Sequence, residues 1–218
     1  LAGLDVLRII NEPTAASLAY GLGMNPTEEK TIAVYDLGGG TFDISILKIS
    51  NGIFEVLSTN GDTYLGGDDL DRVIIEYWLK SWKVNDANNH KQLQQELRLA
   101  AEQAKITLSN ADIFETEFAG EKISITKEVF ENLIQPIVKR TMDCCSNAMR
   151  DAGLQVSDIN TVLMVGGSTR VPMVKQKVAD FFQQAVNDSV NPDEVVALGA
   201  AVQADILAGN NQSMLLLD

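Results

Sequence analysis

The sequence predicts an α/β fold, in which a mixed sheet is flanked by helices and accompanied by a smaller α+β part. Three observations predict this class. Strand-like runs separated by turns fill residues 31–58, apolar residues recur at helical spacing between 70 and 152, and a buried-strand run at 161–165 leads into another helix. A chain of 218 residues, 45% of them hydrophobic, can bury a sizeable core.

The first sixty residues alternate strand runs with turns. A helix with Pro13 in its first turn begins at Asn11 and ends at glycines. Three consecutive glycines and the pair Asn51-Gly52 are hairpin turn signals. We expect strands at 5–10, 31–35, 44–49 and 53–58. The last three strands should form an antiparallel meander.

Helical spacing dominates after a glycine-rich loop at residues 60–69. The long helical stretch 126–152 contains Pro136, which should kink or divide it. The last helix should open at Asn191, with Asn191 as its cap and Pro192 in its first position. We expect helices around 70–78 and 93–104, a small hairpin at 113–118 and 122–125, and a further helix opening at 168–172.

Composition excludes several classes of protein. A net charge of −13 argues against a nucleic-acid surface. The only cysteines, Cys144 and Cys145, are neighbours that do not readily form a disulfide, so a reducing compartment is expected. No run approaches the ~20 apolar residues of a membrane span. His90 is expected at the surface, without a transition-metal site, and the start at Leu1 rather than Met suggests a fragment.

The most informative segment is the octapeptide from Asp36 to Asp43, Asp-Leu-Gly-Gly-Gly-Thr-Phe-Asp. Successive N–H groups in a glycine turn can form an anion-binding concavity. Its glycines permit positive φ and a close approach of ligand to backbone. An aspartate on each side adds carboxylates that can hold a hydrated cation. The pattern favours a phosphate chain with Mg²⁺; the alternative is a plain tight hairpin with solvated acids.

Two further segments could contact a nucleoside. The turn from Gly166 to Arg170 joins a buried strand to a helix start, which is a common ligand crevice in α/β folds. Arg170 could stack on a purine, or it could be solvated beside a tight turn. Glu102, Lys105 and Ser109 share one helix face and could bond a ribose and base edge, or they could form an ordinary polar face.

Three other positions carry alternatives of the same kind. The segment from Gly66 to Asp69 could pass near a phosphate or ribose, or act as an inter-domain hinge. Asp193 could face the ligand or only stabilise a helix N-terminus. Glu12 could be a polar relay or a simple helix-start acid. Neither a Walker P-loop nor a Gly-x-Ser-x-Gly elbow is present in the sequence.

Taken together, these segments resemble the nucleotide-binding domain of the seventy-kilodalton heat-shock chaperones. The order of the segments is specific, and the resemblance covers nearly the whole chain. The residues around the hairpin are most similar to the bacterial and mitochondrial, DnaK-type branch. The segments are Ile9 to Ala16, Asp36 to Asp43, Gly61 to Gly67, Ala101 to Ser109, Val165 to Pro172 and Asn191 to Glu194.

The resemblance implies an actin-like, ribonuclease H-like ATPase fold with nucleotide between two lobes, of which this chain is the second. Its inner subdomain would comprise residues 1–64 and 136–218. Its outer subdomain would be 65–135, and residues 213–218 would begin the interdomain linker.

The resemblance also implies roles for individual residues toward ATP or ADP. Asp36 and Asp43 would lie near Mg²⁺, K⁺ or the attacking water, mostly through water ligands. Together with Thr41 and Glu12 they would form the catalytic group, and Glu12 would also transmit the nucleotide state. The phosphates would contact Gly38, Gly39, Gly40 and Thr41. The remainder of the nucleotide would contact Gly67, Glu102, Lys105, Ser109, Gly166, Gly167, Ser168, Arg170 and Asp193.

Two departures from the family pattern affect these expectations. Some members carry a second Arg where this chain has Ile106, so base stacking would rest on Arg170 and an aliphatic face. The family's first phosphate hairpin and its catalytic Lys belong upstream of this sequence. Because phosphoryl transfer needs charge stabilisation from both sides, the lobe alone should have negligible ATPase activity.

The implied parent protein is a stress-response chaperone that couples ATP hydrolysis to binding and release of unfolded polypeptides, in protein folding or organellar import. Its partners would be the missing lobe and substrate-binding domain, a GrpE-like exchange factor acting on 65–135, a J-domain co-chaperone and unfolded clients. Nucleic acid and membrane are not expected as partners. The compartment would be the bacterial cytoplasm or mitochondrial matrix. The alternatives are an actin-fold kinase of a small metabolite and an actin-like filament protein.

Overall fold

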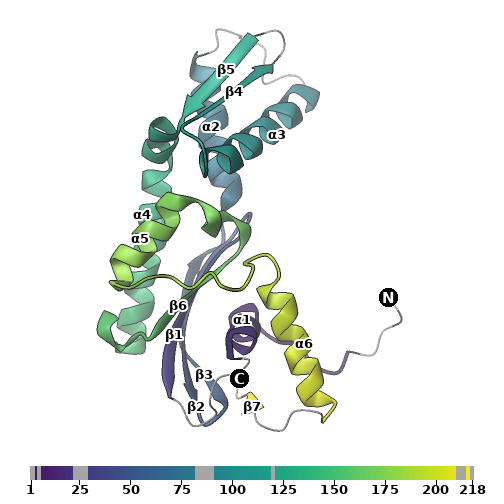
Figure 1. Ribbon diagram of the computed structural model, residues 1–218, viewed down its shortest axis with the longest axis vertical. Coiled ribbons are helices and arrows are strands. Elements are labelled where there is room, and N and C mark those ends of the chain that lie inside the picture. The colour runs from purple at the N-terminus through teal and green to yellow at the C-terminus, as the bar shows by residue number, and fades with distance from the viewer. Residues whose placement is uncertain are drawn as a thin grey trace.

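The computed structural model describes residues 3, 6–21, 29–81, 91–118, 121–209 and 215–216. Figure 1 shows how the helices and strands are arranged. The helices are α1 (Glu12–Gly21), α2 (Gly67–Ser81), α3 (Lys91–Leu108), α4 (Lys127–Ala152), α5 (Pro172–Phe182) and α6 (Val195–Leu207), with 3₁₀ turns η2 (Val156–Asp158) and η3 (Gly167–Arg170). The strands are β1 (Lys30–Leu37), β2 (Phe42–Ser50), β3 (Ile53–Asp62), β4 (Ile113–Phe118), β5 (Glu121–Thr126), β6 (Thr161–Val165) and β7 (Leu215–Leu216).

The main sheet is mixed and has five strands in the order β6-β1-β2-β3-β7. β1, β2 and β3 pair antiparallel, so the predicted meander is confirmed. Asn51 and Gly52 both have positive φ, 53° and 74°, as a two-residue hairpin turn requires. β6 lies parallel to β1 on its other side, which places the two glycine turns that follow these strands at the same end of the sheet.

Helices cover both faces of this sheet. α4 and α5 pack on one face, where Ala33 and Tyr35 of β1 point, and α1 and α6 pack on the other, where Ile32 and Val34 point (Figure 1). β1 is therefore buried on both sides, and this explains its continuous apolar run. Gly199 of α6 allows close contact with α1, because a Cβ there would lie 1.7 Å from the carbonyl oxygen of Ala15.

A smaller α+β part extends from the same core. β4 and β5 form a two-stranded antiparallel sheet that packs with α2 and α3. Trp78 of α2 is buried, and its indole Nε1 donates to the carbonyl of Ser124 on β5 at 3.0 Å. α4 runs alongside both parts, so one apolar cluster continues from the large sheet into the small one.

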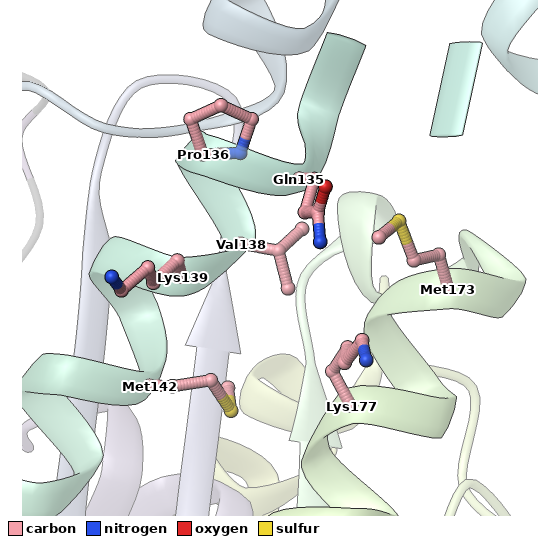
Figure 2. Close-up of a pocket in the computed structure, with 7 residues that line it drawn as sticks. All are labelled: Gln135, Pro136, Val138, Lys139, Met142, Met173 and Lys177. Carbon is pink, nitrogen blue, oxygen red and sulfur yellow. The ribbon is translucent and has the colours of Figure 1, made fainter. Parts of the chain in front are cut away.

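α4 has 26 residues and passes through Pro136 without ending, so the expected division does not occur. Its ends are capped by Thr126, whose side chain accepts from the N–H of Val129, and by Gly153, in the left-handed conformation at φ 69°. α5 lies beside α4 (Figure 1), and a cavity of about 360 Å³ remains between the two helices (Figure 2).

The expected strand at 5–10 is wrong for its described residues. Residues 6–10 form no strand, and Val6, Leu7 and Ile9 are 75%, 85% and 81% exposed. A short apolar run is stable as a strand only where a neighbouring strand pairs with its backbone N–H and C=O groups. In the described part of the chain no strand pairs with this segment.

Three predicted boundaries shift for local reasons. β3 continues to Asp62 because Gly61 pairs with Asp43 of β2, where any side chain would strike the carbonyl of Phe42 at 2.4 Å. α2 begins at Gly67, inside the expected loop. Asn191 caps a turn rather than α6, since its side-chain oxygen accepts from the N–H of Asp193 at 3.2 Å.

The helix expected at 168–172 divides into η3 and α5, and Pro172 takes the first position of α5. Several other predictions fall outside the described residues. They concern His90, the small-hairpin turn at 119–120 and most of the linker at 213–218.

Candidate functional site

The glycine hairpin between β1 and β2 is open on one side. The N–H of Gly38 donates to the carbonyl of Thr41 at 3.1 Å and closes the turn. Gly39 and Gly40 are exposed, and a Cβ built on either would meet no heavy atom within 4 Å. None of the three hairpin glycines is among the positive-φ residues of the described chain. Their missing side chains therefore leave room for a ligand rather than permit a left-handed turn.

The start of α2 fixes the direction of the hairpin peptides. The carbonyls of Gly38 and Gly39 accept from the N–H groups of Gly67 and Asp68, at 2.8 and 2.7 Å. In a trans peptide the N–H points opposite to the carbonyl. The N–H groups of Gly39 and Gly40 therefore point away from α2, toward the open side, as an anion-binding turn requires.

Two glycines hold this arrangement by having no side chain. A Cβ on Gly66 would lie 2.4 Å from the carbonyl oxygen of Gly39. A Cβ on Gly166, which has φ 85°, would lie 2.4 Å from the carbonyl oxygen of Leu37. The structure thus places Gly166 against β1, and its expected contact with a ligand stays a prediction. Gly66 begins the segment that the sequence placed either near a phosphate or ribose or at a hinge, and the structure puts it directly against the hairpin.

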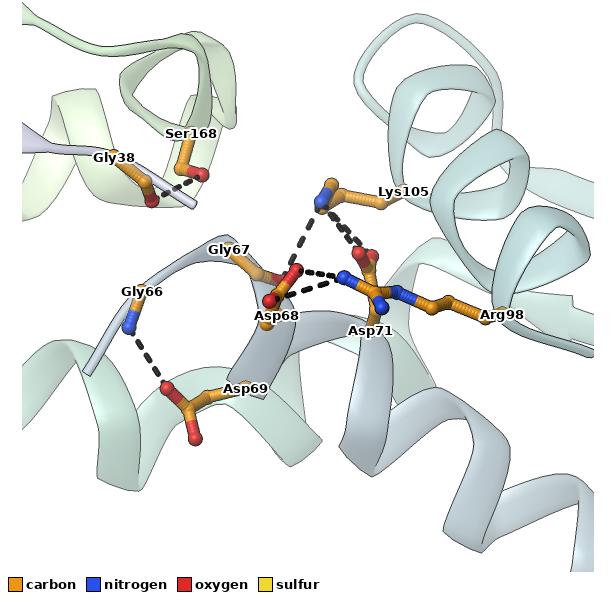
Figure 3. Close-up of polar contacts among 9 residues, drawn as sticks. All are labelled: Gly38, Gly66, Gly67, Asp68, Asp69, Asp71, Arg98, Lys105 and Ser168. Carbon is orange, nitrogen blue, oxygen red and sulfur yellow. Dashed lines mark hydrogen bonds and ion pairs between the residues drawn. The ribbon is translucent and has the colours of Figure 1, made fainter. Parts of the chain in front are cut away.

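Ser168 connects the second glycine turn to the first. Its hydroxyl donates to the carbonyl of Gly38 at 3.2 Å, as Figure 3 shows. A Cβ on Gly67 would lie 2.4 Å from the same hydroxyl oxygen, so α2 and η3 meet at this point. The hairpin, the start of α2 and the turn after β6 are therefore in direct contact.

Lys105 is held inside the site by an acid that the sequence analysis did not single out. Its ammonium lies 2.9 Å from a carboxylate oxygen of Asp71 and 3.4 Å from the carbonyl oxygen of Gly67 (Figure 3). Burial raises the pKa of Asp71, while Lys105 lowers it. Arg98 and Asp68 form a second, exposed ion pair at 3.0 Å between α3 and the start of α2.

Arg170 is oriented by two partners. Its guanidinium donates to the side-chain oxygen of Asn191 at 2.6 Å and to the carboxylate of Asp193 at 2.8 Å. Asp193 was predicted at the site and Asn191 was expected only as a helix cap. The arginine side chain keeps 53% exposure, so one side of it stays open to a ligand.

Two adjoining cavities unite most of the predicted residues. One, of about 480 Å³, reaches the phosphate hairpin at Gly39 and also contacts Gly67, Glu102 and Asp193. The other, of about 400 Å³, extends to Ser109 and Pro172. Their shared lining is Lys105, Ile106, Gly167, Ser168 and Arg170.

The other predicted residues line neither cavity. They are Glu12, Asp36, Gly38, Gly40, Thr41, Asp43 and Gly166.

Ser109 donates its hydroxyl proton to the carbonyl of Lys105 at 3.1 Å, so only its oxygen lone pairs are available to a ligand.

Asp36 and Asp43 face each other across β1 and β2 as register partners. Burial, with smaller contributions from Glu12 and Asp43, raises the pKa of Asp36 to about 6. Burial also raises the pKa of Asp43. Within the described residues, no group of three or more His, Cys, Asp or Glu converges as a metal cage. Burial disfavours the charged forms of Asp36 and Asp43, and both lie beside the open glycine turn. Two such carboxylates fit Mg²⁺, which keeps several water ligands and does not need a cage of protein ligands.

The arrangement of two glycine turns around two adjoining cavities agrees with the family that matches this chain. The Hsp70 protein family profile matches residues 1–218. The chain belongs to the Hsp70 family. Its mixed α/β architecture is consistent with the actin-like ATPase fold implied by the sequence.

The chain is also similar to named chaperones from bacteria. It is 54% identical to the chaperone protein HscA of Cronobacter sakazakii, and 53% identical to those of Escherichia fergusonii and Yersinia enterocolitica. Each comparison covers all of this chain and 35% of the relative, so the chain spans about a third of their length. These matches give no support to a metabolite kinase, a filament protein or a mitochondrial protein. None of the described helices has the length and apolar character needed to cross a bilayer.

Proposed function

We propose that this chain is the second lobe of an Hsp70 ATPase domain and binds ATP and ADP in its two adjoining cavities. One observation carries the proposal. The N–H groups of Gly39 and Gly40 point away from the carbonyls fixed by α2, and Gly39 borders a cavity whose lining also includes Lys105, Arg170 and the second glycine turn. Backbone donors beside partly apolar cavities of about 400 and 480 Å³ match a nucleotide with its phosphates at the hairpin.

The adenosine would lie across the shared lining of the cavities. Arg170, oriented by Asp193, would stack on one face of the base, and Ile106, which is 54% exposed, would supply an aliphatic surface. Gly167 and Ser168 would let the nucleoside approach the backbone. Glu102 and the lone pairs of Ser109 would accept hydrogen bonds from the ribose and base. Gly67 and Lys105 lie between these groups and the phosphate hairpin.

Asp36 and Asp43 would hold hydrated Mg²⁺, and K⁺ where it is present, beside the phosphates. The bound ion would supply positive charge against the phosphate oxygens. Burial raises the pKa of both carboxyls, and the charges of Glu12 and Asp43 add to it at Asp36. A cation would offset these effects, so the donor set fits the ion. The exposed hydroxyl of Thr41 and these carboxylates would orient the attacking water.

Glu12 would transmit the state of the site. It is the first residue of α1, it is exposed, and its charge contributes to the raised pKa of Asp36. A change of charge at Asp36 on nucleotide binding would therefore change the electrostatic energy of Glu12 at the start of α1. α1 packs closely against α6.

In the whole protein, this lobe would act with parts outside the chain. We propose an inner subdomain of 1–64 and 136–218, an outer subdomain of 65–135, and a linker starting near 213. Hydrolysis would require the phosphate contacts of the first lobe, and it would switch a substrate-binding domain between affinities for unfolded polypeptides. An exchange factor would act on 65–135, and a J-domain co-chaperone would stimulate turnover. The bacterial relatives favour a bacterial cytoplasm, which suits the free Cys144 and Cys145.

Equilibrium binding of MgADP and MgATP by this chain tests the proposal. Arg170→Ala should weaken binding by about tenfold, since it removes a cation–π contact and a charged hydrogen-bond donor. Arg150→Ala is the matched control, because Arg150 lies near the end of α4 and pairs only with neighbouring Asp151 among its described contacts. Equal affinities of the two variants, or a folded chain that binds neither nucleotide, would contradict the proposed site.

A further inference from the structure

A third cavity, separate from the two nucleotide cavities, lies between α4 and α5. It has a volume of about 360 Å³ and shares no lining residue with the two nucleotide cavities. Figure 2 shows side chains reaching into the space from both helices. The family comparison and the nucleotide proposal leave this cavity without a role.

The walls of the cavity are mainly apolar. Val138 is buried on the α4 side, and Met142 and Met173 are half-buried and extend from the two helices into the space between them (Figure 2). Pro136 adds an apolar ring above them. Methionine side chains are flexible and polarizable, so this lining can adapt to an aliphatic or aromatic group.

Lys139 of α4 and Lys177 of α5 both line the cavity, and neither side chain pairs with another among the described residues. Lys177 of α5 is exposed, lines the cavity and takes part in no hydrogen bond or ion pair with the residues that the structure describes. Its neighbours are satisfied, since Lys175 pairs with Asp188 at 2.5 Å and Asp180 accepts from Gln176 at 2.7 Å. In a protein of net charge −13, an unpaired ammonium beside an apolar wall is a specific complement for an anion.

Gln135 and Lys139 are the other polar residues of the lining, and their polar ends point in different directions relative to the cavity. The amide of Gln135 lies at the same side of the cavity as Met173 and can donate to an oxygen there (Figure 2). Lys139 contributes its stem to the lining, but its ammonium extends to the side of α4 that faces away from α5 (Figure 2). The cavity therefore offers one charged donor, one amide donor and an apolar interior.

We propose that this cavity binds a small amphipathic carboxylate, with its carboxylate on Lys177 and Gln135 and its aliphatic body against Val138, Met142 and Met173. The volume lies at the lower end of the range for small-molecule sites, roughly 300–1,000 Å³. Strongly polar ligands such as sugars are disfavoured, because the apolar walls would leave their hydroxyl groups unpaired.

A titration of this chain with octanoate and octanamide tests the proposal. The two probes have the same length, and only octanoate carries a charge. Octanoate should shift the methyl NMR signals of Met142 and Met173 saturably, with a Kd on the order of 1 mM for a ligand of this size. Octanamide should bind about tenfold more weakly, because it lacks the charge-assisted hydrogen bond.

Variants of the two lysines separate the proposed contact from a general effect of charge. Lys177→Met should weaken octanoate binding about tenfold and remove the preference over octanamide. Lys139→Met, which removes the ammonium that faces away, should leave both affinities unchanged. Equal binding of the two probes, equal effects of the two variants, or no shift at Met142 and Met173 would overturn the proposal.

Discussion

Asp36→Asn should make the ligand-free protein more stable at neutral pH while weakening its response to Mg²⁺ and nucleotide. In the folded protein the pKa of Asp36 is raised from 3.8 to about 6, first by burial and then by Glu12 and Asp43. A shift of that size corresponds to about 3 kcal/mol, because one pKa unit is about 1.4 kcal/mol. Asparagine keeps the shape of the side chain and removes the charge.

The sign of the effect depends on pH. Below about pH 4 the carboxyl is protonated in both the folded and the unfolded state, so the variant gains nothing. Between about pH 4 and 6 the unfolded state ionises first, and the folded state of the wild type loses stability as pH rises. Above about pH 6 the whole penalty is present, and the variant should be more stable by about 2–3 kcal/mol.

Urea unfolding of both proteins at pH 4 and pH 7.5 measures this difference. Asp112→Asn is the matched control at an exposed aspartate that precedes β4. Addition of Mg²⁺ with ADP at pH 7.5 should stabilise the wild type more than Asp36→Asn. A stability difference that is the same at both pH values would refute the reasoning about burial, and an equal response to Mg²⁺ with ADP would refute the cation site.

Two further perturbations separate the fold from the site. Gly166→Ala should destabilise the fold by roughly 1–3 kcal/mol in urea unfolding, because alanine is strained at φ 85° and its Cβ would strike β1. Gly39→Ala places its Cβ in open space, so it should leave urea unfolding unchanged but weaken MgADP binding. Equal loss of stability in both would contradict the different roles of these glycines. Lys105→Met should cost about 3–5 kcal/mol in urea unfolding, because it leaves Asp71 buried without its cation, and Asp71→Leu in the same chain should recover most of the loss. A double variant no more stable than Lys105→Met would refute that pairing.

Patterns that depend on local chemistry could be predicted from the sequence. The apolar run from Thr31 to Tyr35 is a strand buried on both faces, Asn51-Gly52 forms the expected turn, and Gly153 ends α4 in the left-handed conformation. Each of these features is decided by residues close together in the chain, so spacing and turn preference were sufficient.

Features that depend on distant partners could not be predicted in this way. Residues 6–10 form an apolar run but have no neighbouring strand within the described chain, so they form no strand, and residues 6–9 are exposed. Asp71 pairs with Lys105, 34 residues away in the sequence, and no local pattern indicates that contact. The place of Gly166 against Leu37 follows from the parallel pairing of β6 with β1, which no local pattern indicates.

The ¹⁵N NMR spectrum of the chain during titration with MgADP tests the central claim most directly. The account predicts saturable shifts at the backbone N–H groups of Gly39, Gly40 and Gly167 and at Ile106, because these surround the phosphates and the base. Amides on β4 and β5 should change little, since none of those residues lines either nucleotide cavity. Binding that shifts β4 and β5 but leaves the glycine turns unchanged would contradict the assignment of the site.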